Sequence, residues 1–209
     1  MRNIGIFGGS FDPVHNAHLA LARAAREAFA LDELRVIPAG QPWQKVRAIT
    51  PAVHRVAMLE LALAGDSGIV IDRREIDRAG PSYTLDTVRE LQFEMTQAQT
   101  QAPTQSRCFL IIGQDQYATL HTWHGWRELL SRVTLAVARR PDAALSVDAE
   151  VASHAPRIVP LPMLPISSTD IRARVAAGLP IAHLVSPAVA SYIDQQALYR
   201  ASHHAKPGN

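Results

Sequence analysis

The chain has 209 residues, of which 47% are hydrophobic and 19% charged, and its formal net charge is +2. This length supports one sizeable hydrophobic core, and the composition is that of an ordinary globular domain. So small a net charge gives no basis for nucleic-acid or membrane binding, and no apolar run approaches the roughly 20 residues of a membrane span. The single cysteine, Cys108, excludes an internal disulfide, and the first strand begins too early for a signal peptide, so we expect a cytoplasmic protein.

Short β-rich runs alternate with helical patterns along the chain. Strands are expected at residues 3–8, 34–38, 68–72, 107–113, 133–138 and 157–160. Helices are expected near residues 18–29, 51–64, 84–95, 115–120 with 125–130, 168–177 and 186–196. This alternation predicts an α/β fold, a Rossmann-like doubly wound, mostly parallel sheet with helices on both faces. Residues 1–200 are expected to form a single domain.

Two segments fall outside this pattern. Residues 96–106 (TQAQTQAPTQS) are rich in Gln and Thr and are predicted to form a solvated loop. Residues 201–209 lack apolar periodicity, so we expect them to be a disordered tail. Neither segment is expected to bury much surface.

The first predicted strand ends in a glycine pair, Gly8-Gly9, which is followed by Ser10 and then by a helix. Glycines at such a turn let the backbone approach a ligand closely, and a helix start offers N–H groups and a positive dipole end. His15 and His18 lie three residues apart, so they share one face if the helix has begun by His15. Because each imidazole can donate a hydrogen bond to a phosphate oxygen, the pattern predicts a phosphate-binding site.

The residues of this region also allow other interpretations. The histidine pair could be a surface accident, or it could bind a metal. A zinc site needs a third or fourth ligand, and no cysteine cluster or spaced carboxylate lies nearby in the sequence, so we predict no metal site. A dinucleotide-binding turn is disfavoured because GGSFDP at residues 8–13 does not fit G-x-G-x-x-G.

The stretch GGSFDPVHNAH at residues 8–18 resembles the G-G-[ST]-F-D-P-x-H-x-G-H signature of the nucleotidyltransferase superfamily. Members of that superfamily activate the α-phosphate of a nucleoside triphosphate. One position departs from the signature, because Ala17 stands where the family has glycine. A methyl group there would crowd the approach of the backbone to the nucleotide, which bears on the placement of the base and not on the chemistry.

Later segments resemble one family within that superfamily, the bacterial nicotinate-nucleotide adenylyltransferases, over nearly the whole length from Asn3 to Arg200. The segments that carry this resemblance are PSYT at 81–84, IIGQD at 111–115, TWHGW at 122–126, RRP at 139–141, ISSTDIR at 166–172 and ALYR at 197–200. A second departure is QPWQK at 41–45, where many members carry Pro-Pro-His-Lys. Lys45 is retained, so the resemblance still implies phosphate binding by this loop, without the histidine contact.

The resemblance implies two neighbouring nucleotide sites. The ATP site would comprise Gly8, Gly9, Ser10, Phe11, His15, His18, Gly113, Ser167, Ser168 and Arg172. The acceptor site would comprise Lys45, Tyr83, Thr84, Leu85, Asp115, Trp123 and His124. The catalytic residues would be His18 as the main donor to the transition state, with His15, Lys45 and Arg172 assisting it. Mg²⁺ is expected to accompany ATP and to bridge its phosphate oxygens.

Several of these residues also have plain structural interpretations. Asp115 follows a buried strand and could either accept hydrogen bonds from ribose hydroxyls or cap the next helix. Trp123 could either stack on a heterocycle or belong to the core. Ser167-Ser168 precedes Arg172 as a helix start would, which suits a triphosphate but is also an ordinary cap with a solvated arginine. Thr84 is expected to be the N-cap of its helix. No role is assigned to Arg139-Arg140.

By resemblance the reaction is ATP plus nicotinate mononucleotide giving nicotinate adenine dinucleotide and pyrophosphate. The attacking phosphate is already ionised near neutral pH, which explains the lack of a nucleophile–base–orienter triad in the sequence. The alternative within the superfamily is a pantetheine-phosphate adenylyltransferase, whose chain is usually shorter and lacks the PSYT and Thr-Trp elements. An alternative from another class is a nucleotide-binding sensor without turnover, which the intact His18 disfavours.

Overall fold

The protein is described by a computed structural model that covers residues 1–41, 49–99, 105–138, 146–161 and 164–200. Its strands form one sheet in the order β3-β2-β1-β4-β5-β6, and every neighbouring pair is parallel. The strands are β1 (Arg2–Gly9), β2 (Glu33–Pro38), β3 (Ile69–Ile71), β4 (Ser106–Gly113), β5 (Thr134–Ala138) and β6 (Arg157–Val159). The chain winds outward from β1 in one direction and then returns beside β1 as β4, so the strand order reverses between these two strands.

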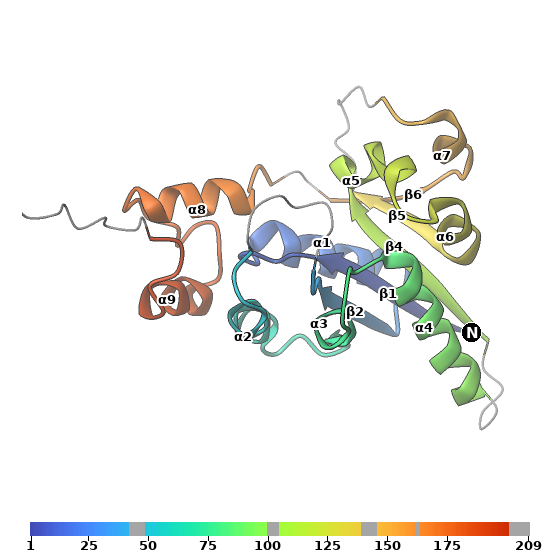
Figure 1. Ribbon diagram of the computed structural model, residues 1–209, viewed down its shortest axis with the longest axis horizontal. Helices are drawn as coiled ribbons and strands as arrows, with labels where there is room; N and C mark the ends of the chain where they lie inside the picture. Colours follow the sequence, from blue (N-terminus) through green and yellow to red (C-terminus); the bar gives the residue numbers. More distant parts are fainter. Residues whose placement is uncertain (42–48, 100–104, 139–145, 162–163, 201–209) are drawn as a thin grey trace, which may run out of the picture.

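Helices connect the strands and cover both faces of the sheet (Figure 1). They are α1 (Asn16–Ala28), α2 (Ala52–Leu63), α3 (Arg74–Asp77), α4 (Thr84–Gln99), α5 (Gln114–Ala118), the 3-10 turn η1 (Leu120–Thr122), α6 (Trp126–Arg132), α7 (Ala149–Ser153), α8 (Ser168–Ala176) and α9 (Pro187–Gln195). Of the helices that the structure describes, none has the length and apolar character that crossing a membrane requires.

The sheet separates two hydrophobic cores because successive side chains of a strand point to opposite faces. In β4, Phe109 and Ile111 pack with residues of α1, α2, α8 and α9, whereas Leu110 and Ile112 pack with residues of α4, α5, α6 and α7. All four side chains are at most 5% exposed. The predicted doubly wound α/β fold, with its parallel sheet and helices on both faces, is therefore confirmed.

One predicted loop is wrong in its first part. Residues 96–106 were expected to be a loop throughout, but α4 continues to Gln99, and the Thr96 hydroxyl donates to the Gln92 carbonyl oxygen at 2.8 Å. Gln and Ala are good helix formers, so this low-complexity composition can extend a helix that has already begun. Residues 100–104 and the predicted tail at 201–209 lie outside the described residues.

Two short helices, α3 and α7, were not predicted. The signal for α7 is present in the sequence, because Asp148 is its N-cap and accepts from the N–H groups of Glu150 and Val151 at 2.9 and 3.2 Å. The N-cap of α3 is Arg73, which makes no capping bond with its side chain, but the preceding Asp72 carboxylate accepts from the Arg74 N–H at 3.1 Å. Both helices are too short to show an apolar period, which is why only their caps could have indicated them.

Candidate active site

The turn between β1 and α1, residues 9–15, is called the motif loop below. It leaves the carboxyl end of β1, which pairs with β2 on one side and with β4 on the other. Gly113 ends β4 and pairs with Ala138 at the end of β5, so the glycines predicted for the ATP site all lie at this edge of the sheet. In open parallel sheets, ligands bind in the crevice outside the carboxyl ends of the strands, where the strand order reverses. The motif loop occupies that position.

The two histidines of the motif are stacked on one another. Helix α1 begins at Asn16, after His15, yet the two imidazole centroids are 3.6 Å apart with an interplanar angle of 21°. The backbone N–H of His15 donates to Nδ1 of His18 at 3.3 Å. Because Nδ1 of His18 accepts that bond, the neutral ring carries its proton on Nε2. His18 is thus held as a hydrogen-bond donor through Nε2.

His15 lies deeper than His18. Its side chain is 6% exposed, burial lowers its pKa to about 4, and its Nδ1 has no hydrogen-bond partner among the described residues. The ring is therefore neutral near pH 7, and it offers one N–H and one lone pair rather than a positive charge.

Phe11 supports the histidine pair from below. Its side chain is 1% exposed, and its ring meets the His18 ring edge-on with centroids 5.1 Å apart. A Cβ at Gly9 would lie only 3.0 Å from the Phe11 ring, so glycine at that position makes room for the ring. Phe11 was expected to contact ATP, but its side chain is part of the core. Any contact with a nucleotide would have to come from its backbone.

The segment ISSTDIR lies directly against the motif loop, although it is about 155 residues away in sequence. The Ser168 hydroxyl donates to the Pro13 carbonyl oxygen at 3.0 Å, and the Arg172 guanidinium donates to the Asp12 carbonyl oxygen at 2.7 Å. Ser167 is the N-cap of α8 and accepts from the Asp170 N–H at 3.0 Å. The structure thus brings the start of α8 to the ATP site predicted from sequence. Both serine hydroxyls already make protein contacts there, which the sequence interpretation did not foresee.

A buried polar network beneath the motif loop was missed. Asp12 is fully buried, and it accepts from the Tyr199 hydroxyl at 2.7 Å and from the Thr50 N–H at 3.4 Å. Arg55 is 1% exposed and donates to the carbonyl oxygens of Ser10 and Thr50 at 2.9 and 2.8 Å. Burial lowers the pKa of Arg55, and the nearby Asp12 carboxylate offsets part of that effect. In sequence, Arg55 is one arginine in an apolar helix, which gives no signal of this contact.

The two elements predicted for the acceptor meet through their aromatic rings. The rings of Tyr83 and His124 lie 4.5 Å apart, centroid to centroid, with a tilt of 32°. The Tyr83 carbonyl oxygen accepts from the N–H groups of Asp86 and Thr87, so Tyr83 caps α4, and the expectation that Thr84 is the cap is wrong by one residue. The helix start and the segment after η1 are thereby held side by side.

Leu85 is a supporting residue rather than a pocket side chain. It is 2% exposed and packs in the core, so its predicted contact with the acceptor can come only from the backbone. Gly125 lies against it with φ +60°, and a Cβ added at Gly125 would overlap the Leu85 side chain. Glycine is required at position 125 both by the left-handed backbone and by this close contact.

We expect Gly125→Ala to destabilise the protein by about 1–3 kcal/mol more than Gly178→Ala. Gly178 is a matched control, because its φ is +68° but a Cβ there would meet no atom within 4 Å. Both variants strain the backbone, and only Gly125→Ala also displaces Leu85. The free energies of unfolding in urea measure the difference, and equal losses would show that the Leu85 contact is readily relieved.

The remaining residues predicted for the acceptor site are Trp123, Asp115 and Lys45. Trp123 is half-buried and packs against the core on the α4 side of the sheet, and its indole N–H has no partner among the described residues. Asp115 is exposed in the first turn of α5, whose N-cap is Gly113, so the interpretation of Asp115 as a cap is wrong. Lys45 and Arg139-Arg140 lie outside the described residues.

A second tether at the acceptor side was also missed. The Ser82 hydroxyl oxygen accepts from the N–H groups of Gly40 and Gln41 at 3.2 and 3.3 Å, and the Ser82 N–H donates to the Gln41 carbonyl oxygen at 3.2 Å. A Cβ at Gly40 would overlap the carbonyl oxygen of Glu75, so the chain after β2 packs closely on α3. Ser82 thus holds the chain at Gly40 and Gln41, just after β2 and before the segment that contains Lys45.

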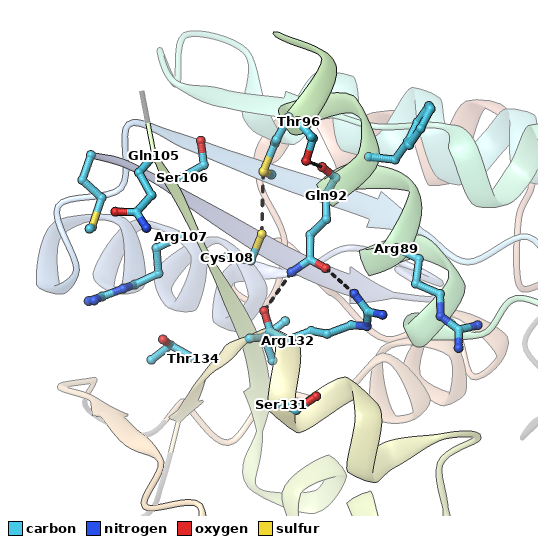
Figure 2. Close-up of a pocket in the computed structure, with 14 residues that line it drawn as sticks. Arg89, Gln92, Thr96, Gln105, Ser106, Arg107, Cys108, Ser131, Arg132 and Thr134 are labelled. Atoms are coloured by element: carbon cyan, nitrogen blue, oxygen red, sulfur yellow. Dashed lines mark hydrogen bonds between the residues drawn. The ribbon is translucent and has the colours of Figure 1, made fainter. Parts of the chain in front are cut away.

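A further hollow on the described part of the chain lies at the other end of the sheet. It has a volume of about 840 Å³ and is lined by residues at the amino ends of β4 and β5, opposite to the motif loop (Figure 2). In it the Gln92 side chain bridges to Arg132, with bonds of 2.9 and 3.0 Å, and Arg132 also pairs with Glu128 at 2.8 Å. Cys108 lies 3.8 Å from the Met95 sulfur, and burial raises the pKa of its thiol. Gln92 and Arg132 are thus paired with each other, and no histidine is among the residues that line this hollow.

The strand order of the sheet reverses between β1 and β4, and a glycine turn and two stacked imidazoles lie at that place. This fold and site are those of a nucleotidyltransferase. In agreement, the model of the family described as cytidylyltransferase-like matches residues 6–174.

Curated relatives narrow this class. A probable nicotinate-nucleotide adenylyltransferase of Methylibium petroleiphilum is 50% identical over 204 residues, which cover 95% of this chain and 92% of that protein. One of Albidiferax ferrireducens is 44% identical, covering 97% and 100%. The chain belongs to the nicotinate-nucleotide adenylyltransferase family. The fold is shared with Plasmodium falciparum nicotinic acid mononucleotide adenylyltransferase complexed with NaAD, at a TM-score of 0.73, 20% identity and coverage of 95% and 98%.

Proposed function

We propose that this chain transfers the adenylyl group of ATP to nicotinate mononucleotide, giving nicotinate adenine dinucleotide and pyrophosphate as a step of NAD biosynthesis. The observation that carries the proposal is the stacked His15–His18 pair at the carboxyl edge of the sheet, in a chain 50% identical to a relative named for this activity. A cytoplasmic location is part of the proposal, and the single, buried Cys108 of the chain is consistent with a reducing compartment.

In the proposed reaction, a phosphate oxygen of the mononucleotide attacks the α-phosphorus of ATP. The new P–O bond forms as the bond from the α-phosphorus to the leaving pyrophosphate breaks, and no proton has to move because the attacking phosphate is ionised. Catalysis then consists of positioning and of stabilising negative charge on the phosphates. This mechanism needs a site that donates hydrogen bonds to the phosphates, and it needs no general base.

The roles of the residues follow from their geometry. His18 would donate through Nε2–H to the α-phosphate, because its Nδ1 is engaged by the His15 backbone. Neutral His15 would donate to the same phosphates, and the Arg172 guanidinium and the start of α8 would add charge and N–H groups beside them. Lys45 is proposed to bind phosphate from the segment that Ser82 anchors.

Mg²⁺ belongs to this proposal as the companion of ATP. In the part of the chain that the structure describes, no three His, Cys, Asp or Glu side chains gather to hold a metal ion. The donor set therefore fits an ion that is held chiefly by phosphate oxygens of the bound nucleotide, as is usual for Mg²⁺. No protein ligand to the ion is assigned.

Release of pyrophosphate from MgATP tests the proposal with three acceptors, namely nicotinate mononucleotide, nicotinamide mononucleotide and 4′-phosphopantetheine. Rapid release with nicotinate mononucleotide is expected. Release with phosphopantetheine alone would instead identify a pantetheine-phosphate adenylyltransferase. ATP binding without release in any of the three would identify a nucleotide sensor.

A further inference from the structure

We propose that Tyr199 is a positioning residue for adenylyl transfer, acting through the Asp12 carboxylate on the motif loop that carries the two histidines. The inference rests on the proposed function and concerns a side chain about 187 residues away from that loop in sequence. Tyr199 touches no reacting group. Its part is to hold the loop in the one arrangement in which His18 is aimed at the α-phosphate.

The contact itself is short and buried. The Tyr199 hydroxyl donates to Oδ1 of Asp12 at 2.7 Å, and the Asp12 side chain is fully buried. Burial and the neighbouring carboxylate both raise the pKa of Tyr199, so the phenol stays protonated and remains a donor. A buried carboxylate keeps its place only while donors satisfy it. Loss of this hydroxyl would therefore remove a short bond to a buried side chain of the motif loop, which also accepts from the Thr50 N–H at 3.4 Å.

Three further contacts hold the backbone of the loop. Arg55 donates to the Ser10 carbonyl oxygen, Arg172 to the Asp12 carbonyl oxygen and Ser168 to the Pro13 carbonyl oxygen, at 2.9, 2.7 and 3.0 Å. These three bonds fix the course of the chain from α2 and α8. The Asp12 side chain accepts from the Tyr199 hydroxyl, in the segment that follows α9, at 2.7 Å and from the Thr50 N–H, just before α2, at the longer distance of 3.4 Å.

The path from Asp12 to the histidines is short. Phe11 precedes Asp12 and has φ +47°, and its ring lies edge-on beneath His18 with centroids 5.1 Å apart. A shift of Asp12 therefore changes the support under the His18 ring. A donor displaced from its optimal position loses much of its effect on the transition state.

The backbone of Tyr199 has an unusual conformation where it makes this contact. Its φ is +60°, a left-handed conformation that non-glycine residues rarely adopt and that persists only where the surroundings enforce it. The turn after α9 is closed by the Leu198 N–H, which donates to the Ile193 carbonyl oxygen at 3.0 Å, and by the ion pair of Arg200 with Asp194 at 2.6 Å. The strained turn directs Tyr199 towards the motif loop. Figure 1 shows α9 near the amino end of α1, on the side of the sheet where that loop lies.

The test compares Tyr199→Phe with Tyr192→Phe. Tyr192 is a matched control, because its hydroxyl also makes a hydrogen bond, to Nδ1 of His54 at 3.0 Å, but that bond joins α9 to α2 away from the motif loop. We expect Tyr199→Phe to lower kcat for pyrophosphate release by about tenfold or more, the scale typical of residues that orient a catalytic group. KM for nicotinate mononucleotide should change less than about twofold, and Tyr192→Phe should leave kcat within about twofold of the parent value.

Hydrogen exchange of the peptide covering residues 9–18 gives a second readout that does not depend on activity. Faster exchange in Tyr199→Phe, and unchanged exchange in Tyr192→Phe, is the expected result. The inference is overturned if Tyr199→Phe matches the parent protein in kcat and exchange, or if the two variants lose turnover equally. If the parent protein itself releases no pyrophosphate, the proposed function fails, and the exchange comparison still decides whether Tyr199 positions the loop.

Discussion

Replacement of His18 with alanine is expected to lower kcat for adenylyl transfer by about 100-fold or more and to leave the fold intact. His18 is held ready before substrate arrives, because the His15 N–H fixes Nδ1 and the Phe11 ring supports the imidazole from below. Removing one preorganised donor to developing charge costs about 3–4 kcal/mol in the transition state. The ring is only partly buried, so its loss should cost far less stability than activity.

Pyrophosphate release and urea unfolding of the same preparations measure the two effects. His154→Ala is the matched control, because this histidine is exposed at the end of α7 and contacts neither nucleotide element. Its turnover should equal that of the parent protein. If His18→Ala retains parental turnover, the assignment of His18 as the main donor is wrong.

The strands and the motif loop could be predicted because their signals are local. Alternating apolar side chains in β4 and the Gly8-Gly9 turn are each contained within a few residues, and both are found where they were expected. The start of α8 was predicted at the ATP site from the resemblance and from its helix-start pattern, and the bonds from Ser168 and Arg172 to the motif loop show how the fold brings it there.

Contacts between distant segments could not be predicted in this way. Asp12 and Tyr199 are 187 residues apart, and although Tyr199 belongs to the ALYR segment that carries part of the resemblance, no period or spacing indicates that it meets Asp12. Arg55 lies on a helix between apolar neighbours, where the pattern favours a solvated side chain, yet it is 1% exposed because it reaches two backbone carbonyl oxygens. Such residues become visible only when the fold brings their partners together.

The error at the start of α4 concerns its cap. Thr84 has the better capping side chain, but the backbone carbonyl of Tyr83 receives the first helical bonds, and the Tyr83 ring also contacts His124. This shift matters for the acceptor site, because it decides which N–H groups of α4 point out of the helix.

Nicotinate mononucleotide is expected to be preferred over nicotinamide mononucleotide by at least about 100-fold in kcat/KM, roughly 2.7 kcal/mol. The N–H groups of Thr84 and Leu85 precede the first helical bonds of α4, which begin with the Asp86 N–H donating to the Tyr83 carbonyl oxygen. The Tyr83–His124 ring contact brings this helix start to the segment that contains Trp123. A carboxylate on the pyridine ring can accept from every such donor, and it also gains from the positive end of the helix dipole.

A carboxamide is neutral, and its NH₂ end would face these donors with nothing to accept their hydrogen bonds. Leaving donors unpaired in a closed site is a stronger source of specificity than a small difference in size. Trp123→Ala should weaken use of the mononucleotide far more than ATP binding, because the half-buried indole is proposed to stack on the pyridine ring. Steady-state kinetics with both mononucleotides, on the parent protein and on Trp123→Ala, measure these effects. Comparable efficiencies with the two acceptors would mean that the donors at the start of α4 do not face the ring substituent, and selection between the two would then have to come from elsewhere in the acceptor site.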